Sequence, residues 1–361
     1  MYLHPLRLAI ASILLSLSLL AQSTTTPAVA YVYIGETTSP LTLAAIRVLS
    51  DGSTQTVGGS PFIIGAFAMA ASANYVFVTG GKKITTYRRS ATGTLSFSSQ
   101  VDALANSGGP LQWNVFHLTL DRTASSLYSS QGDLFGEYDK SDTGRLTFLT
   151  NSEALGTYTK NLTFSHSDQF AYFAQCPSSE WRLFGYIRQP DGTLTRFDTG
   201  DTIPPNNGLR LCPSDIKSSA LGYMAVAYGV AGYEGTHSIA VYRVTSSGEL
   251  QYVSSITTEF IRTQSQLLTI QFDPTGVYLA AIGQKAIQLY KLSSTGILSK
   301  AGSALYPNTA FKDLKWDKSG HVYTISSTAL YSFKLKNGQL AQFSSPRSVP
   351  NATSLVVVSL Q

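Results

Sequence analysis

The sequence predicts an all-β protein, a seven-bladed β-propeller whose blades are four-stranded antiparallel sheets. Three observations predict this fold: a glycine-centred turn that recurs seven times, an alternating strand pattern around each turn, and a spare strand at the end of the chain. The 361 residues are 43% hydrophobic and only 13% charged, and they include 29 Gly and 20 Tyr. This composition is typical of short strands joined by tight turns.

The recurring turn defines the repeat. Its glycines follow one another at intervals of 41 to 56 residues, which match the length of known propeller blades. A tyrosine stands six residues before the glycine in five copies, and a leucine stands two residues after it in six copies. Glycine suits a hairpin turn because it readily adopts positive φ. The seven glycines are Gly52, Gly93, Gly144, Gly192, Gly248, Gly296 and Gly338.

A further short strand precedes each later repeat and brings the number of strands to four. Residues 162–164, 268–272 and 314–316 are examples, and in each of them every second residue is bulky and apolar. The first repeat begins near Ala30 without such a strand, whereas the chain ends with a spare one at residues 354–360. We expect this last strand to complete blade one and close the ring, which removes the open sheet edges. An open sandwich array, the alternative, leaves the last strand unexplained.

The N-terminus has the pattern of a secretory signal peptide, residues 1–23. One arginine precedes an apolar stretch at residues 8–20, and Ala21-Gln22-Ser23 fits a small-x-small cleavage site. The apolar stretch is shorter than the ~20 residues of a membrane-spanning helix, although an uncleaved anchor is the alternative. We therefore expect residues 24–361 to form one propeller domain, secreted or periplasmic, with no membrane span after signal cleavage.

Charge and motifs exclude several function classes. The net charge is +5 and no run of five or more Lys and Arg occurs, so we expect no nucleic-acid partner. Dinucleotide, P-loop and serine-hydrolase signatures are absent, and Gly80-Gly81-Lys82-Lys83 predicts a hairpin loop, so we expect no cofactor. His166 and His321 fall at inter-strand turns, where we expect solvated side chains, and no ligand spacing indicates a metal site. We expect a monomer.

The two cysteines, Cys176 and Cys212, predict a disulfide. Cys176 ends the second strand of blade four, and Cys212 opens the inner strand of blade five, so both lie on the same face of adjacent blades. A compartment outside the cytoplasm permits the bond. Such a bond stabilises a protein by roughly 3–4 kcal/mol in the chain-entropy model. Two unpaired thiols near a loop are the alternative.

Three sequence features together resemble a known family. They are Gly-Ser-Pro-Phe at residues 59–62, Phe-Asp-Pro-Thr-Gly-Val-Tyr-Leu at residues 272–279, and the repeated Tyr-x5-Gly-x-Leu. Over residues 30–361 the pattern resembles the lactonase-like seven-bladed propellers, which include 6-phosphogluconolactonase and muconate-cycloisomerase-like proteins. Inner strands of that family often contain Gly-Pro-Arg-His-x-x-Phe-x-Pro-x-Gly. The resemblance implies a site at the channel mouth, near the carbonyl or carboxylate of a substrate.

Carried onto this chain, the resemblance points to particular residues. His117 matches the family histidine, whereas Phe116 stands where the arginine is expected, and no repeat keeps Arg and His together. The resemblance implies that His117 activates water and that Lys160 from the next blade stabilises the oxyanion. A partly buried histidine bonded to nearby backbone is the alternative for His117. The matching positions of blades four, six and seven imply substrate-binding roles for Asn161, Thr269, Lys312 and Asp313.

Two functions of different class follow. The first is a lactonase-type hydrolase outside the cytoplasm, acting on a small-molecule lactone or sugar acid such as 6-phosphogluconolactone. It predicts polar groups around a funnel at the channel mouth. The second is a non-catalytic propeller that binds a protein or carbohydrate partner on one face. It predicts an aromatic rim drawn from Trp113, Trp181, Tyr228 and Tyr233. The sequence leaves both open.

Overall fold

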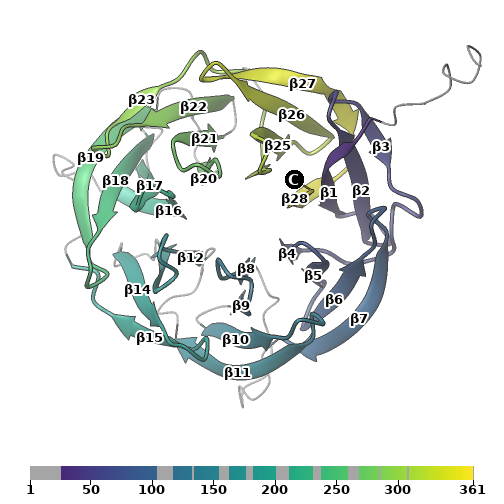
Figure 1. Cartoon of the computed structure of the whole chain (residues 1–361), viewed down its shortest axis with the longest axis horizontal. Helices are drawn as coiled ribbons and strands as arrows, with labels where there is room; N and C mark the ends of the chain where they lie inside the picture. The colour runs from purple at the N-terminus through teal and green to yellow at the C-terminus, as the bar shows by residue number, and fades with distance from the viewer. Residues whose placement is uncertain are drawn as a thin grey trace, which may run out of the picture.

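Seven four-stranded antiparallel sheets form a ring around a central axis (Figure 1). The computed structural model describes residues 26–103, 117–131, 134–153, 162–175, 182–200, 211–230, 237–258, 268–283, 286–306 and 309–360. Every regular element in these ranges is a β-strand, which confirms the predicted all-β propeller. The same ranges contain no helix long and apolar enough to cross a membrane.

The blades follow one another along the chain, and each consists of four strands that succeed one another from the axis outward. Blade one is β28 (Ala352–Ser359), β1 (Ala28–Glu36), β2 (Thr42–Leu49) and β3 (Thr54–Thr56). Blade two is β4 (Ala68–Ala71), β5 (Tyr75–Thr79), β6 (Lys83–Arg89) and β7 (Leu95–Asp102). Blade three is β8 (His117–Leu120), β9 (Ser126–Gln131), β10 (Leu134–Lys140) and β11 (Leu146–Glu153). Blade four is β12 (Thr163–Phe164), β13 (Phe170–Gln175), β14 (Arg182–Arg188) and β15 (Leu194–Phe197).

The last three blades have the same order. Blade five is β16 (Leu211–Ser218), β17 (Tyr223–Val230), β18 (His237–Val244) and β19 (Leu250–Thr258). Blade six is β20 (Thr269–Phe272), β21 (Tyr278–Ile282), β22 (Ile287–Leu292) and β23 (Leu298–Lys300). Blade seven is β24 (Asp313–Trp316), β25 (His321–Ile325), β26 (Ala329–Lys336) and β27 (Gln339–Ser348).

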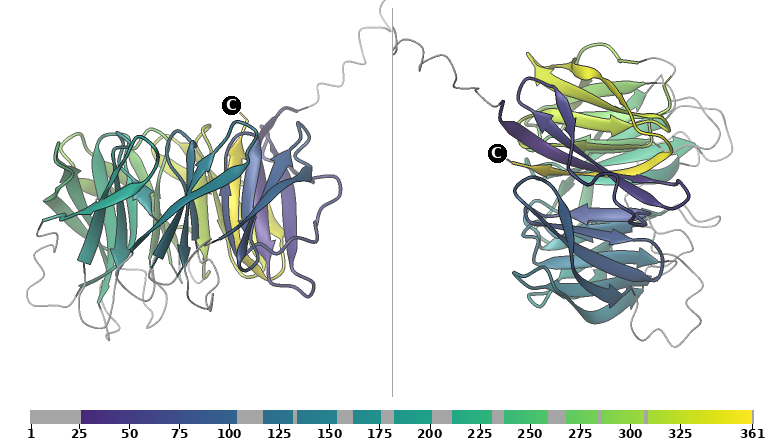
Figure 2. Two further views of the ribbon diagram at one scale, coloured as in Figure 1. Left: turned by 90° about the horizontal axis from the view of Figure 1, so that it is seen from below. Right: turned by 90° about the vertical axis from the view of Figure 1, so that its right-hand side faces the viewer.

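The last strand closes the ring, as predicted. β28 pairs antiparallel with β1, and the yellow C-terminal strand lies beside the purple N-terminal one in Figure 2. In this pairing Val356 lies opposite Tyr33. Backbone hydrogen bonds extend the pairing at both ends, from Thr37 N to Asn351 O at 3.1 Å and from Leu360 N to Val29 O at 2.9 Å. Blade one is therefore built from both ends of the described chain, and its inner strand faces the axis like the others.

The glycine turns join each blade to the previous one. All seven repeat glycines have positive φ, between +75° and +89°. Gly93 of blade two lies against the ring of Tyr31 in blade one, so a Cβ there would approach that ring to 2.4 Å. Its carbonyl also accepts a hydrogen bond from the Tyr33 hydroxyl at 2.7 Å. Tyr128 donates to Gly192 O in the same way, and Tyr172 donates to Gly248 O.

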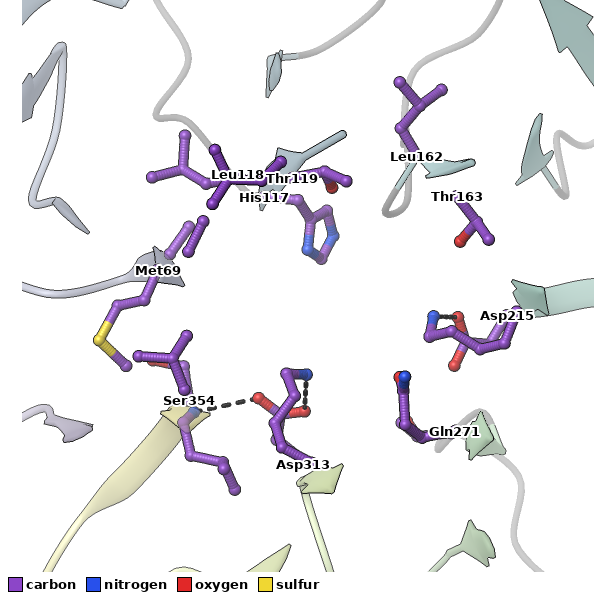
Figure 3. A pocket seen from close by; sticks show the side chains of 18 of the residues that line it. Met69, His117, Leu118, Thr119, Leu162, Thr163, Asp215, Gln271, Asp313 and Ser354 are labelled. Atoms are coloured by element: carbon purple, nitrogen blue, oxygen red, sulfur yellow. Dashed lines mark hydrogen bonds and ion pairs between the residues drawn. The ribbon is translucent and has the colours of Figure 1, made fainter. Parts of the chain in front are cut away.

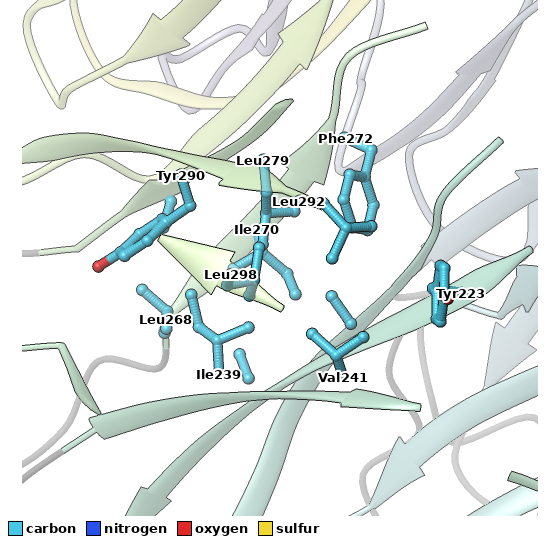
Figure 4. Close-up of a cluster of buried hydrophobic side chains, with 13 residues drawn as sticks. Tyr223, Ile239, Val241, Leu268, Ile270, Phe272, Leu279, Tyr290, Leu292 and Leu298 are labelled. Atoms are coloured by element: carbon cyan, nitrogen blue, oxygen red, sulfur yellow. The ribbon is translucent and has the colours of Figure 1, made fainter. Parts of the chain in front are cut away.

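The hydrophobic core lies between adjacent blades. In the cluster of Figure 4, Ile239 and Val241 of blade five pack against Ile270, Leu279 and Tyr290 of blade six. The repeated tyrosine and leucine belong to these cores: Tyr290 is fully buried, and Leu298 after the turn is 6% exposed. Apolar burial at ~25 cal/mol per Å² makes each interface a main source of stability. The repeat is therefore the sequence pattern of this interface.

Two loop and turn predictions had different outcomes. The Gly80–Lys82 segment joins β5 to β6, which confirms the hairpin loop. The expectation of a solvated His321 is wrong, because this side chain is only 2% exposed. Its Nδ1 lies 2.8 Å from Asp317 Oδ2, and its ring stacks on Phe343 with centroids 4.2 Å apart. Asp317 orders the turn by accepting backbone N–H bonds, and this places the imidazole inside the blade.

Several predictions fall on residues outside the described ranges. They concern the signal peptide at residues 1–23, the site residues Lys160 and Asn161, and Cys176. Cys212 is buried near the start of β16, as expected. The Cys176–Cys212 disulfide therefore stays a prediction.

Candidate functional site

A cavity of about 630 Å³ lies on the axis and is lined by the inner strands of all seven blades (Figure 3). This volume suits a small-molecule ligand. The inner strands place some side chains in the cores and others along the cavity. In β20, for example, Ile270 is fully buried, whereas Thr269 and Gln271 are partly exposed and line the cavity. The period of two that forms the strand therefore also selects the residues of the site.

The predicted site residue His117 begins β8 and is partly exposed. Figure 3 shows its imidazole pointing into the cavity, and Thr163 of the next blade lines the same cavity. The Thr163 hydroxyl donates to Ile216 O at 2.6 Å, so it also links blades four and five.

Two aspartate–lysine pairs lie on other walls of the cavity. Asp215 and Lys217 from β16 form a short ion pair in which both side chains are mostly buried. Asp313 and Lys315 from β24 repeat this pair with an Nζ–Oδ1 distance of 2.9 Å. Each pair has the sequence Asp-x-Lys, because residues two apart on a strand lie on the same face. Gln271 of blade six lies between the two pairs and also lines the cavity (Figure 3).

The other predicted binding residues that the structure describes also line this cavity. Thr269, Lys312 and Asp313 come from blades six and seven. The Lys312 ammonium donates to Ala352 O at 2.9 Å, which connects blade seven to the closing strand. Asp313 is held by Lys315 and by backbone N–H groups. The substrate-binding roles of these residues stay predictions.

Sequence reasoning missed Asp215, Lys217, Gln271 and Lys315. A signal for three of them was present, because Asp-x-Lys occurs at the same place in the inner strands of blades five and seven. The first of these strands is harder to align, since a bulge between Pro213 and Asp215 shifts the register of β16 against β17. An alignment anchored on the turn after each inner strand would have placed both pairs at one level.

The cavity wall is asymmetric. Blades three to seven contribute an imidazole, hydroxyls, an amide, carboxylates and ammonium groups. Blades one and two contribute mostly small or apolar side chains, including Ala68, Ala70 and Val356, and blade one adds the hydroxyls of Thr353 and Ser354. Phe67 stands beside them at 41% exposure. Ligand groups that bind polar side chains are therefore expected to point mainly toward blades three to seven.

The predicted aromatic rim is not supported at the one rim position that the structure describes. Tyr228 is 2% exposed, and its hydroxyl lies 2.8 Å from the Tyr242 hydroxyl inside blade five. Trp113, Trp181 and Tyr233 lie outside the described residues. Tyr228 is buried because its strand packs this side chain into the core between blades four and five.

Comparison with known proteins points to one family. The family model described as lactonase, 7-bladed beta-propeller, matches residues 24–311. Comparison with curated proteins gives no match.

Solved structures share the fold over almost the whole chain. A candidate 6-phosphogluconolactonase from Bacteroides fragilis has a TM-score of 0.73 at 13% identity, over 93% of this chain and 99% of that one. The periplasmic gluconolactonase of Pseudomonas aeruginosa has a TM-score of 0.71 at 14% identity, over 92% of this chain and 100% of that one. A protein from Lactobacillus plantarum has a TM-score of 0.70 at 12% identity, over 92% and 99%. Identities this low show a common fold only.

Proposed function

The chain belongs to the lactonase family of seven-bladed β-propellers, and we propose that it hydrolyses a small lactone in the axial cavity. The observation that carries the proposal is the His117 imidazole pointing into a polar cavity of about 630 Å³ (Figure 3). Sugar lactones, including 6-phosphogluconolactone, are the substrates to test first, because three solved structures with TM-scores of 0.71 to 0.73 are named for them. The signal-peptide pattern supports a site of action outside the cytoplasm.

Hydrolysis needs a base for the attacking water and donors for the developing oxyanion. In the proposed reaction His117 takes a proton from water as the water oxygen bonds to the lactone carbonyl carbon. The ring C–O bond then breaks, and the ring oxygen takes that proton and becomes a hydroxyl group. Lys217 and Lys315 are paired with Asp215 and Asp313, so the positive excess of the described lining residues comes from Arg122 and Lys312. This excess favours the anionic transition state.

The test is lactone hydrolysis by the mature protein beside a His117→Ala variant. Loss of a general base lowers the rate by about 10²–10⁴-fold. Thr119→Ala is the matched control, because Thr119 lines the same cavity two residues along β8. Absence of turnover in a folded wild-type protein on every lactone in the panel would reject the proposal, and so would an unchanged rate in His117→Ala.

A further inference from the structure

Four backbone N–H groups around the cavity are occupied by two carboxylates. Asp215 accepts from Ile216 N through Oδ1 and from Ile270 N through Oδ2, both at 3.0 Å. Ile270 belongs to the next blade, so the carboxylate bridges two inner strands. Asp313 does the same between blades seven and one: Oδ1 accepts from Leu314 N at 2.8 Å, and Oδ2 accepts from Leu355 N at 3.0 Å.

Blades two and three have the same pair of backbone groups without a carboxylate. Met69 and Leu118 stand three residues before the first turn residue of their blades, as Ile216 and Ile270 do. Ala68 precedes Met69 at the position of the bridging aspartate, and its methyl group cannot accept a hydrogen bond. In the antiparallel ladders β4–β5 and β8–β9, alternate residues donate to the neighbouring strand, and the bonds Ser72 N to Tyr75 O and Asp121 N to Ser126 O fix which ones. The N–H groups of Met69 and Leu118 therefore point away from β5 and β9.

These two groups border the cavity. Met69 and Leu118 line it although their side chains are packed into inter-blade cores, so their main chain is the part that faces the space. Figure 3 shows the Met69 side chain directed away from the cavity. His117 immediately precedes Leu118, so the candidate base and one candidate donor are adjacent on β8.

The charge of the wall favours an anion. Among the residues that the structure describes, the charged side chains that line the cavity are Arg122, Lys217, Lys312 and Lys315 against Asp215 and Asp313, which leaves two positive charges in excess. Blade two has Ala70 where blades five and seven have their lysines. A ligand carboxylate therefore meets neither a resident carboxylate nor a side-chain ammonium at this place.

We propose that the backbone N–H groups of Met69 and Leu118 form a third carboxylate cradle, which receives the reacting carboxyl group of the ligand. The inference rests on the proposed function. The cradle holds the oxyanion while water adds to the lactone carbonyl, and it holds the carboxylate after the ring C–O bond has broken. The acid proton of the product leaves to solvent, so water and lactone give a hydroxy carboxylate and a proton.

The first test measures carboxylate binding and needs no hydrolysis. Thermal unfolding is followed in sodium formate and in sodium chloride at equal ionic strength. Formate is expected to raise the Tm of the wild type by about 2–4 °C over chloride. Ala68→Asp supplies a tethered carboxylate, so it should raise the Tm without formate and abolish the response to formate.

Two variants make this test specific. Ala70→Asp adds the same charge two residues further along β4, where no pair of N–H groups is bridged, and it should keep the formate response. Asp313→Ala empties the cradle between blades seven and one, and formate should raise its Tm more than that of the wild type. If Asp313→Ala gains nothing from formate, this fold does not bind free carboxylates at such pairs, and the inference is wrong.

The second test measures lactone hydrolysis, and its outcomes separate the two proposals. Loss of oxyanion-hole donors lowers kcat by about 10²–10³-fold, so Ala68→Asp should lose at least about 100-fold. If Ala68→Asp keeps full activity and the wild type shows no formate response, the cradle is rejected and the lactonase function is kept. A formate response that Ala68→Asp removes, in a protein that hydrolyses no lactone, would keep the cradle and reject the function. If the wild type shows neither a formate response nor lactone hydrolysis, both proposals are rejected.

Discussion

Replacing Glu137 with glutamine is expected to stabilise the propeller above pH 7 and to leave its stability unchanged near pH 4.5. Glu137 lies in β10 and has no exposed surface. One carboxylate oxygen accepts a short hydrogen bond from Ser152, and the other accepts from Leu194 N of blade four at 3.1 Å. Burial disfavours the charged form and raises the pKa of Glu137 to about 7.

The sign and size follow from linkage. The pKa is higher in the folded state than the ordinary value of 4.5, so the folded protein carries no penalty from this group while both states are protonated. The penalty develops as the pH rises from about 4.5 and is complete above pH 7. A pKa change from 4.5 to about 7 corresponds to about 3 kcal/mol. Glutamine has the shape of the protonated acid and titrates at neither pH.

The assay is denaturant unfolding of wild type and Glu137→Gln from pH 4.5 to pH 8.5. Glu249→Gln is the control, because it makes the same change at an exposed position and should show no pH-dependent difference. A difference between wild type and Glu137→Gln that is constant across this range would refute the reasoning. A variant less stable than wild type at pH 8 would refute it as well.

Three further predictions concern contacts between or within blades. Arg188→Met removes the cation 2.6 Å from the fully buried Asp121 carboxylate and should cost about 3 kcal/mol in denaturant unfolding. The double variant Arg188→Met with Asp121→Asn should recover part of this loss. A cost below about 1 kcal/mol for Arg188→Met would contradict a buried ion pair. Gly93→Ala should destabilise the protein by about 2 kcal/mol or more, because φ is +88° and the new Cβ meets the Tyr31 ring. Gly81→Ala is the control and should cost less, because no atom lies within 4 Å of its new Cβ. Equal changes of Tm in the two variants would contradict this reasoning. The predicted Cys176–Cys212 disulfide is tested by thiol labelling: the unfolded, unreduced protein should show no thiol that reacts with a maleimide, and a reactive thiol would rule out the bond. Cys212→Ser should lower the free energy of unfolding by about 3 kcal/mol.

The candidate site was predictable only in part. His117, Thr269, Lys312 and Asp313 all line the cavity, because alignment of the inner strands identifies the residues that face the axis. The roles are harder to predict than the positions. The sequence indicates a ligand-binding cation at Lys312, yet its ammonium donates to the backbone of the closing strand. The partner lies 40 residues further along the chain, so no local pattern contains it.

His321 shows that the exposure of a turn residue is also difficult to predict from the sequence. Its place at a turn predicted exposure, whereas Asp317 and the Phe343 ring enclose it. The Phe343 ring comes from the outer strand of the same blade, and only the packing of four strands brings it over the turn. Burial of a turn residue therefore depends on contacts that periodicity does not encode.

The sequence by itself determined the architecture. The repeated glycine turn, the tyrosine and leucine around it and the spare last strand specify seven blades and their closure, because local φ preference and a period of two act within a few residues. The tertiary structure alone decided how the polar groups that line the axial cavity are paired. Two aspartates bridge neighbouring blades through backbone N–H groups, and Ala68 leaves one equivalent pair open. This difference depends on where main-chain groups from different blades meet, and main-chain groups are identical in every residue of the sequence except proline.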